Sequence, residues 1–230
     1  MKRSDVNLVD CGSCPYLANR WWHSAAMHVE EIAPEELEPF FDQGYQRFGQ
    51  SLYVPSCRGC TECVPIRLDV LRYRPSRTQR QVWKRNQDVE VRIGPPHYTK
   101  EAYDLYLQFM LRRFPNSQPP NENYFQFLLE CHYGFSAMFT YWLEGRMAGF
   151  GVLDPTPRSA YSYMFAWHFD FPERRLGAFS LLKEVEFCRQ TGREHLYLGL
   201  FVRDCPSMNY KANFKPYELR NSEGAWIEYC

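Results

Sequence analysis

Hydrophobic and polar residues alternate in short runs along most of this chain, and turn-forming residues separate the runs. Alternation with a period of two is typical of half-buried strands, whereas apolar residues spaced three or four apart are typical of helices. We expect strands over residues 23–29, 66–70, 89–93, 137–143, 147–154, 160–165, 195–199 and 217–220, and a strand or turn over residues 46–54. We expect helices over residues 34–44, 78–87, 99–114, 124–130 and 178–191.

Capping signals support several of these helices. Pro34, which two glutamates follow, suits a first helical turn, where a missing N–H is tolerated and negative charge is favoured. Ser76 and Thr99 are expected to cap the helices that follow them. Gly192 suits the position just after a helix, where the backbone often turns left-handed. The capping residues therefore predict where these helices begin or end, in addition to the hydrophobic periodicity.

The clearest boundary in the chain is Gly94-Pro95-Pro96. We expect a cysteine-rich, basic N-terminal region over residues 1–94 and a second domain over residues 95–230. In the second region a run of strands precedes a helix that opens at a glycine-containing turn, and another strand follows. This is the element order of an acyltransferase-type domain, so the predicted fold class is mixed α/β (α+β).

Charge is unevenly distributed although the formal net charge of the 230 residues is zero. No acidic residue occurs from Val70 to Gln87. On the predicted helix Arg77, Arg80 and Lys84 recur at i, i+3 and i+7, so they share one face. A concentrated basic face of this kind is predicted to bind the phosphates of a nucleic acid, and a merely solvated charged face is the alternative.

Nine cysteines, an odd number, argue against a disulfide framework. No apolar leader and no apolar run of about 18 residues is present, so we expect a cytoplasmic protein that does not enter a membrane. Two groups of cysteines lie about 40 residues apart, a pattern that suits a thiolate site for an iron–sulfur cluster or zinc. The candidate ligands are Cys11, Cys14, Cys57, Cys60 and Cys63. Burial of some of them as small apolar residues is the alternative.

Four longer motifs are specific enough to indicate a family. They are Tyr53-x-Pro55-x-Cys57-x2-Cys60-x2-Cys63-x-Pro65-x-Arg67, Arg74-Pro75-Ser76-Arg77-x-Gln79-Arg80-x3-Lys84-Arg85-Asn86-x-Asp88, Tyr197-Leu198-Gly199 and Met208-x-Tyr210-Lys211-Ala212-x-Phe214-x-Pro216. Together they resemble the bacterial aminoacyl-tRNA–protein transferases, the aspartate/glutamate leucyltransferases that are related to eukaryotic arginyltransferases. The resemblance spans nearly the whole chain.

The resemblance implies a fold and an activity. It implies an acetyltransferase-like (GNAT) C-terminal domain and an N-terminal cysteine-rich lobe related to the same fold. Members of the family move an amino acid from charged tRNA to the α-amine of proteins that begin with Asp or Glu, which marks those proteins for degradation. The bacterial donor is leucyl-tRNA and the eukaryotic donor is arginyl-tRNA. Cys11 and Cys14 form a pair as in the eukaryotic members, whose cysteines are associated with an iron–sulfur cluster.

An aminoacyl ester is already activated, so positioning is expected to supply most of the rate. The attacking amine then needs only a modest base and a donor for the oxyanion. The predicted catalytic residues are Tyr163, Tyr197 and Lys211. The tyrosine hydroxyls are expected to hold the amine or the ester, and Lys211 is expected to contact the terminal adenosine phosphate or the acidic side chain of the substrate. Buried packing tyrosines and a solvated lysine are the alternatives. The predicted substrate- and tRNA-binding residues are Arg77, Arg80, Lys84, Arg85 and Asn86. An apolar pocket would suit leucine and a carboxylate would suit arginine, and the many Phe and Tyr residues of the C-terminal strands favour leucine.

Two other functions fit part of the sequence. Arg174-x2-Gly177 before a helix partly resembles the loop with which coenzyme A acetyltransferases grip pyrophosphate, although the second glycine is missing. A metal-stapled RNA-binding module would explain the basic helix and the cysteines, but it would leave the C-terminal half unexplained.

Overall fold

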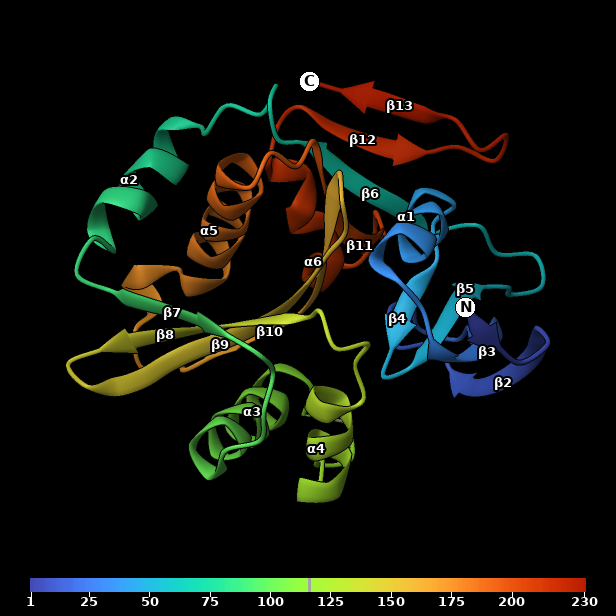
Figure 1. Ribbon diagram of the computed structural model, residues 1–230, viewed down its shortest axis with the longest axis horizontal. Coiled ribbons are helices and arrows are strands. Elements are labelled where there is room, and N and C mark those ends of the chain that lie inside the picture. The colour runs from blue at the N-terminus through green and yellow to red at the C-terminus, as the bar shows by residue number, and fades with distance from the viewer. Residues whose placement is uncertain (116) are drawn as a thin grey trace.

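The computed structural model describes residues 1–115 and 117–230, and it contains two β-sheets that pack against each other (Figure 1). The smaller sheet has five strands in the order β1-β3-β5-β4, with β2 paired to β3. Its strands are β1 (Lys2–Arg3), β2 (Asn7–Ser13), β3 (Trp21–Glu31), β4 (Gln46–Phe48) and β5 (Ser51–Pro55). Helix α1 (Pro34–Asp42) lies between β3 and β4 in the sequence.

The larger sheet has eight strands in the order β13-β12-β6-β11-β10-β9-β8-β7. Its strands are β6 (Val64–Asp69), β7 (Glu90–Gly94), β8 (Ala137–Leu143), β9 (Arg146–Pro155), β10 (Ser159–Trp167), β11 (His195–Phe201), β12 (Tyr217–Arg220) and β13 (Trp226–Tyr229). Every neighbouring pair is antiparallel except β10 and β11, which run parallel. Parallel neighbours need a crossover connection, and helix α5 supplies it.

Helices cover both faces of the larger sheet. The helices after α1 are α2 (Arg77–Arg85), α3 (Lys100–Arg113), α4 (Glu122–Glu130), α5 (Leu176–Gln190) and α6 (Pro206–Asn209), with short 3-10 turns at η1 (Pro172–Arg174) and η2 (Tyr210–Asn213). Helices α2 and α5 share one hydrophobic cluster with one face of the sheet. On the other face α3 and α4 pack over β8 to β10, and α1 with the smaller sheet packs over β10 and β11. Figure 1 shows α2 and α5 on one side of the molecule and the smaller sheet on the other.

Most of the predicted elements are present in the structure. The mixed α/β fold is confirmed, and the side chains of Ser76 and Thr99 accept hydrogen bonds from the helix backbone as expected. Strands β1, β2 and β13 were not predicted. Strand β2 is exposed along nearly its whole length, so no buried face imposes alternation on its sequence.

The chain passes from the smaller to the larger sheet earlier than the sequence indicated. Gly94-Pro95-Pro96 follows the edge strand β7, which pairs with β8. Strand β6 lies between β12 and β11, well inside the larger sheet. Strands β6 and β7 thus belong to the same sheet as the C-terminal strands, on the N-terminal side of the predicted division. The glycine ends β7, and the two prolines follow it.

Candidate functional site

The parallel strands β10 and β11 part halfway along their length. They pair only through Ser159–Tyr161 on β10 and His195–Tyr197 on β11. Both strands continue beyond this ladder, to Trp167 and to Phe201. On its other side β11 also departs from regular pairing with β6 between Tyr197 and Leu200. Backbone N–H and C=O groups beyond the paired residues are free to bind a ligand, so this part of the sheet is a candidate site.

Three polar side chains converge on Gly199, where the strands part. Its φ of +78° favours glycine, and a Cβ built there would lie 3.1 Å from Gln46 Oε1. The same Cβ would lie 3.8 Å from Lys211 Nζ and 3.8 Å from the hydroxyl of Tyr161. Gln46 comes from β4 of the smaller sheet, and its Oε1 accepts a hydrogen bond from the Tyr161 hydroxyl at 3.1 Å. Glycine at residue 199 therefore allows three buried polar groups to lie close to the backbone of β11, where a side chain would crowd Gln46.

Lys211 is the one cation of this cluster. It lies on η2, its side chain is buried, and its Nζ donates to the backbone carbonyl of Leu200 at 2.7 Å. Burial lowers the pKa of the Lys211 ammonium to about 7. Near neutral pH the group therefore exists partly as a free amine, which is the form that can accept a proton.

Tyr163 lies beside this cluster on β10. Its hydroxyl accepts a hydrogen bond from the Gly49 N–H at 3.2 Å, and burial raises its pKa. The guanidinium of Arg47 lies 3.6 Å from the centre of its ring, a cation–π contact. Tyr163 is thus held against the smaller sheet on two sides.

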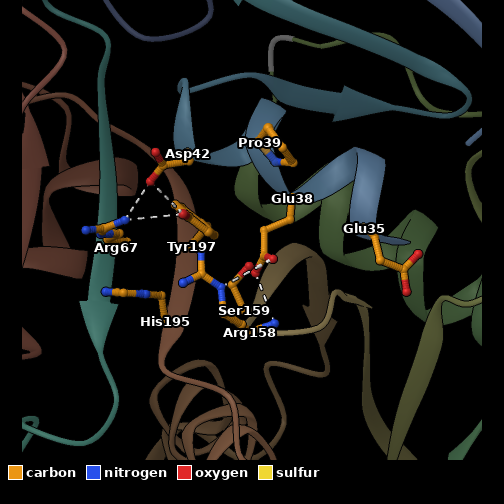
Figure 2. Close-up of a pocket in the computed structure, with 9 residues that line it drawn as sticks. All are labelled: Glu35, Glu38, Pro39, Asp42, Arg67, Arg158, Ser159, His195 and Tyr197. Atoms are coloured by element: carbon orange, nitrogen blue, oxygen red, sulfur yellow. Dashed lines mark hydrogen bonds and ion pairs between the residues drawn. The ribbon is translucent and has the colours of Figure 1, made fainter. Parts of the chain in front are cut away.

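Tyr197 belongs to a different environment, a polar pocket of about 260 Å³ between α1 and strands β6, β10 and β11 (Figure 2). Its hydroxyl donates to Asp42 Oδ1 at 3.1 Å and accepts from Arg67 Nη1 at 3.3 Å. Asp42 Oδ1 also accepts from Arg67 at 2.8 Å and from the Trp226 indole at 3.0 Å. Four hydrogen bonds therefore already engage this hydroxyl and carboxylate, so Tyr197 is held by structural hydrogen bonds instead of facing Lys211.

A buried ion pair that sequence reasoning missed joins the two sheets. Arg47 on β4 and Asp154 on β9 are 3% and 0% exposed, and Arg47 Nε donates to Asp154 Oδ2 at 2.5 Å. The other carboxylate oxygen of Asp154 accepts from the Ser136 hydroxyl at 2.5 Å. Arg47 Nη1 donates to the Gly49 carbonyl at 2.9 Å. Gln46 and Arg47 are consecutive buried polar residues in a strand, and that is the sequence signal that could have identified them.

The basic face of α2 is exposed as predicted. Arg77, Arg80 and Lys84 make no ion pair with an acidic side chain in the part of the chain that the structure describes. The exposed Arg85 donates to the Glu173 carbonyl at 2.5 Å. Three or four cations on one helix are therefore available to an anionic partner.

Asn86 differs from the other predicted RNA contacts. It is 1% exposed, and its amide donates to the carbonyls of Val82 and Arg174, each at 2.8 Å. The amide fixes the end of α2 to the start of α5. The prediction that Asn86 contacts RNA needs correction, because this residue presents almost no surface.

Three of the other candidate cysteines, Cys14, Cys57 and Cys60, lie in the neighbourhood of Cys63. Burial and the nearby thiols of Cys14, Cys57 and Cys60 together raise the pKa of the Cys63 thiol to about 12. Cys11 lies apart, with its thiol directed to the Val9 carbonyl at 3.6 Å and to Ser24 Oγ at 3.5 Å. As the side chains stand, no three His, Cys, Asp or Glu residues among residues 1–115 and 117–230 are close enough together to hold a metal ion. Cysteine sulfurs are nevertheless the soft donors that zinc and iron–sulfur clusters require.

Comparison with known proteins identifies the family. The model of the arginine-tRNA-protein transferase C terminus matches residues 101–221, and the model of the N terminus of the same family matches residues 12–81. The chain belongs to the aminoacyl-tRNA–protein transferase family. The family predicted from the motifs is thereby confirmed, and so is the prediction that the protein is an aminoacyltransferase.

Similar transferases cover nearly the whole chain. The aspartate/glutamate leucyltransferase of Pseudomonas fluorescens is 31% identical over 90% of this chain and 89% of its own length. The enzyme of the same name from Chromohalobacter salexigens is 33% identical over 76% of this chain and 72% of its own length. Among solved structures, FemX is similar with a TM-score of 0.49 and 10% identity, over 80% of this chain and 64% of its own.

No described helix of the transferase combines the length and the apolar character that a membrane span requires.

Proposed function

We propose that this transferase moves leucine from leucyl-tRNA to the α-amine of proteins that begin with Asp or Glu. The names of its relatives, which share about 30% of its residues over most of the chain, support this donor and these acceptors. We place the reaction in the cytoplasm, where charged tRNA and the proteins to be degraded meet. The observation that carries the proposal is the buried Lys211 at the point where β10 and β11 part.

The reaction exchanges an ester for an amide. The acceptor nitrogen attacks the carbonyl carbon of the aminoacyl ester, the bond from that carbon to the ribose oxygen breaks, and the proton of the amine ends on the ribose oxygen. Lys211 has a pKa of about 7, so near neutral pH it can take the proton from the amine and return it to the leaving oxygen. No covalent enzyme intermediate is needed.

The side chain of Lys211 is held in place by its neighbours. The Leu200 carbonyl accepts a hydrogen bond from Lys211 Nζ, which orients this nitrogen. Gly199 allows Gln46 and Tyr161 to lie close to Lys211, and the ester is proposed to bind beside this cluster. Tyr163, fixed by Gly49 and Arg47, is proposed to line the same site. Tyr197 supports the site through Asp42 and Arg67, without contact to the reacting atoms.

The cations of α2 are proposed to bind the tRNA backbone instead of the acidic acceptor side chain. Helix α2 packs on the face of the larger sheet that carries α5, whereas Gln46 and Tyr161 lie on the opposite face with the smaller sheet. Arg77, Arg80 and Lys84 therefore lie on the face of the sheet opposite Gln46 and Tyr161. Exposed cations without acidic partners suit phosphates, whose binding releases counterions.

A metal centre in the smaller sheet is proposed as a structural element. Cys14, Cys57, Cys60 and Cys63 would hold zinc or an iron–sulfur cluster, with Cys11 outside the set. Bound metal would stabilise the thiolates and cross-link residues far apart in the sequence. The transfer itself moves no electrons, so none of its steps needs the metal.

The proposal is tested by measuring transfer of radiolabelled amino acid to peptides that begin with Asp, Glu or Ala. Leucyl-tRNA and arginyl-tRNA serve as donors in parallel reactions. We expect leucine on the Asp and Glu peptides and no label on the Ala peptide. Label from arginyl-tRNA alone would replace the proposed donor, and equal labelling of the Ala peptide would remove the acidic specificity.

A further inference from the structure

A groove of about 370 Å³ lies between α2 and α5, on the sheet face opposite Gln46 and Tyr161. The two helices run antiparallel, because the end of α2 is tied to the start of α5 through Asn86 and the Arg174 carbonyl. The groove is lined by Tyr73, Pro75, Gln79, Arg80, Trp83, Lys84, Leu182, Val185, Glu186, Arg189 and Gln190. None of the roles proposed for the transfer reaction uses this space.

The lining combines an apolar wall with a cationic rim. Leu182, Val185 and the half-buried indole of Trp83 form the apolar part. Arg80 and Lys84 are exposed at its edge. Neither cation is paired with an acidic side chain within residues 1–115 and 117–230.

Other charges in the groove are already engaged. The carboxylate of Glu186 is paired with Lys183 at 2.5 Å, so it repels an anion less than a free carboxylate would. The guanidinium of Arg189 donates to the carbonyls of Val70 and Tyr73, each at 2.6 Å. Arg80 makes one hydrogen bond, to the Pro75 carbonyl at 2.6 Å, which leaves most of its donors free. The free charge at the groove is therefore positive.

We propose that this groove holds an unpaired nucleobase of the RNA donor, packed against Trp83, with the adjoining phosphates bound by Arg80 and Lys84. A base has an apolar face and lies next to backbone phosphates, and this matches an apolar wall with two cations at its edge. An uncharged protein segment would gain nothing from the absence of acidic residues between Val70 and Gln87, whereas RNA would. The inference rests on the proposed function only in taking RNA as the carrier of the amino acid.

The test compares two uncharged RNAs, a blunt hairpin and the same hairpin with four unpaired nucleotides at its 3′ end. Binding of each is measured at several salt concentrations for the wild type, Trp83→Ala, Trp83→Phe and Gln190→Trp. Gln190 is exposed at the groove, so a tryptophan there fills the space without removing a packing contact. The Gln190→Trp variant keeps the test decisive if Trp83→Ala folds poorly. Arg146→Gln, at an exposed arginine that is paired with Asp170 and does not line the groove, is the control for a surface substitution elsewhere.

We expect Trp83→Ala and Gln190→Trp to weaken binding of the overhang RNA by about tenfold, with little change for the blunt hairpin. Trp83→Phe should retain most of the affinity. Equal losses on both RNAs, or no loss on either, would overturn the inference. An increase in the KM for the acceptor peptide without a change in RNA affinity would show that the groove holds protein, and this would also overturn it. If the wild type binds neither RNA, the inference is overturned as well. The peptide-labelling assay tests the proposed donor separately, so the two failures are distinguishable.

Discussion

Replacing Arg47 with methionine should destabilise the protein strongly, because the substitution leaves Asp154 without its cation. Both side chains are buried, and the pair joins β4 of the smaller sheet to β9 of the larger one. After the substitution the carboxylate keeps only the Ser136 hydroxyl as a partner. Arg47 also supports Tyr163 through a cation–π contact, so the change should affect the proposed site as well.

The size of the effect follows from burial. Removing one member of a buried ion pair costs about 3–5 kcal/mol, because the remaining charge is uncompensated. For a chain of this length each kcal/mol lowers the Tm by about 2–4 °C, so the Tm should fall by roughly 6–20 °C. The exposed pair Arg92 and Glu90, with side chains 55% and 60% exposed, provides the contrast. Exposed pairs contribute about 0–1 kcal/mol, so Arg92→Met should have a small effect.

Urea unfolding followed by circular dichroism measures both variants. The double variant Arg47→Met with Asp154→Leu should regain at least half of the loss, because replacing a whole buried pair by apolar side chains is often neutral. If Arg47→Met costs no more than Arg92→Met, the buried pair does not hold the sheets together and the reasoning is refuted. A double variant as unstable as the single one would show that packing, not charge, causes the loss.

Three further predictions follow from the site and the cysteines. Single-turnover transfer should depend on two deprotonations, of Lys211 at a pKa of about 7 and of the acceptor amine at about 7.7–8.0, so log rate against pH should rise with a slope near two below pH 7. Lys211→Met should reduce that slope to one, and a wild-type slope of one would contradict the proposed role. Gly199→Ala should destabilise the fold by about 1–2 kcal/mol, measured by urea unfolding, because its φ is positive and its Cβ crowds Gln46; an unchanged midpoint would speak against this geometry. Elemental analysis should find zinc or iron bound to the purified protein and lost in Cys63→Ser but retained in Cys11→Ser, and loss in both variants would return Cys11 to the ligand set.

The sequence predicts the elements whose signals are local. The Ser76 side chain accepts from the Gln79 N–H and the Gln79 side chain accepts from the Ser76 N–H, so four consecutive residues contain the whole start of α2. Short apolar runs bounded by turn residues likewise identify β8, β9 and β10. These features need no information about distant parts of the chain.

The site depends on contacts between distant residues, and periodicity does not encode them. Arg47 and Asp154 are 107 positions apart, and Gln46 and Tyr161 are 115 apart. Lys211 was predicted from a motif, yet the motif does not say that its amine lies buried beside Gly199. Periodicity also does not show which strands pair. The sequence therefore suggested a boundary at residue 94, although β6 lies between β11 and β12 in one continuous sheet.

The central claim is that transfer occurs beside Lys211, with this residue moving the proton. Single-turnover transfer of leucine from leucyl-tRNA to a peptide beginning with Glu tests it directly, when Lys211→Met is compared with the wild type at saturating tRNA. The account predicts a loss of roughly 10²–10⁴-fold in rate with an unchanged Kd for leucyl-tRNA, since proton transfer is removed and RNA binding on α2 is not. A variant that transfers leucine within a few-fold of the wild-type rate would contradict it.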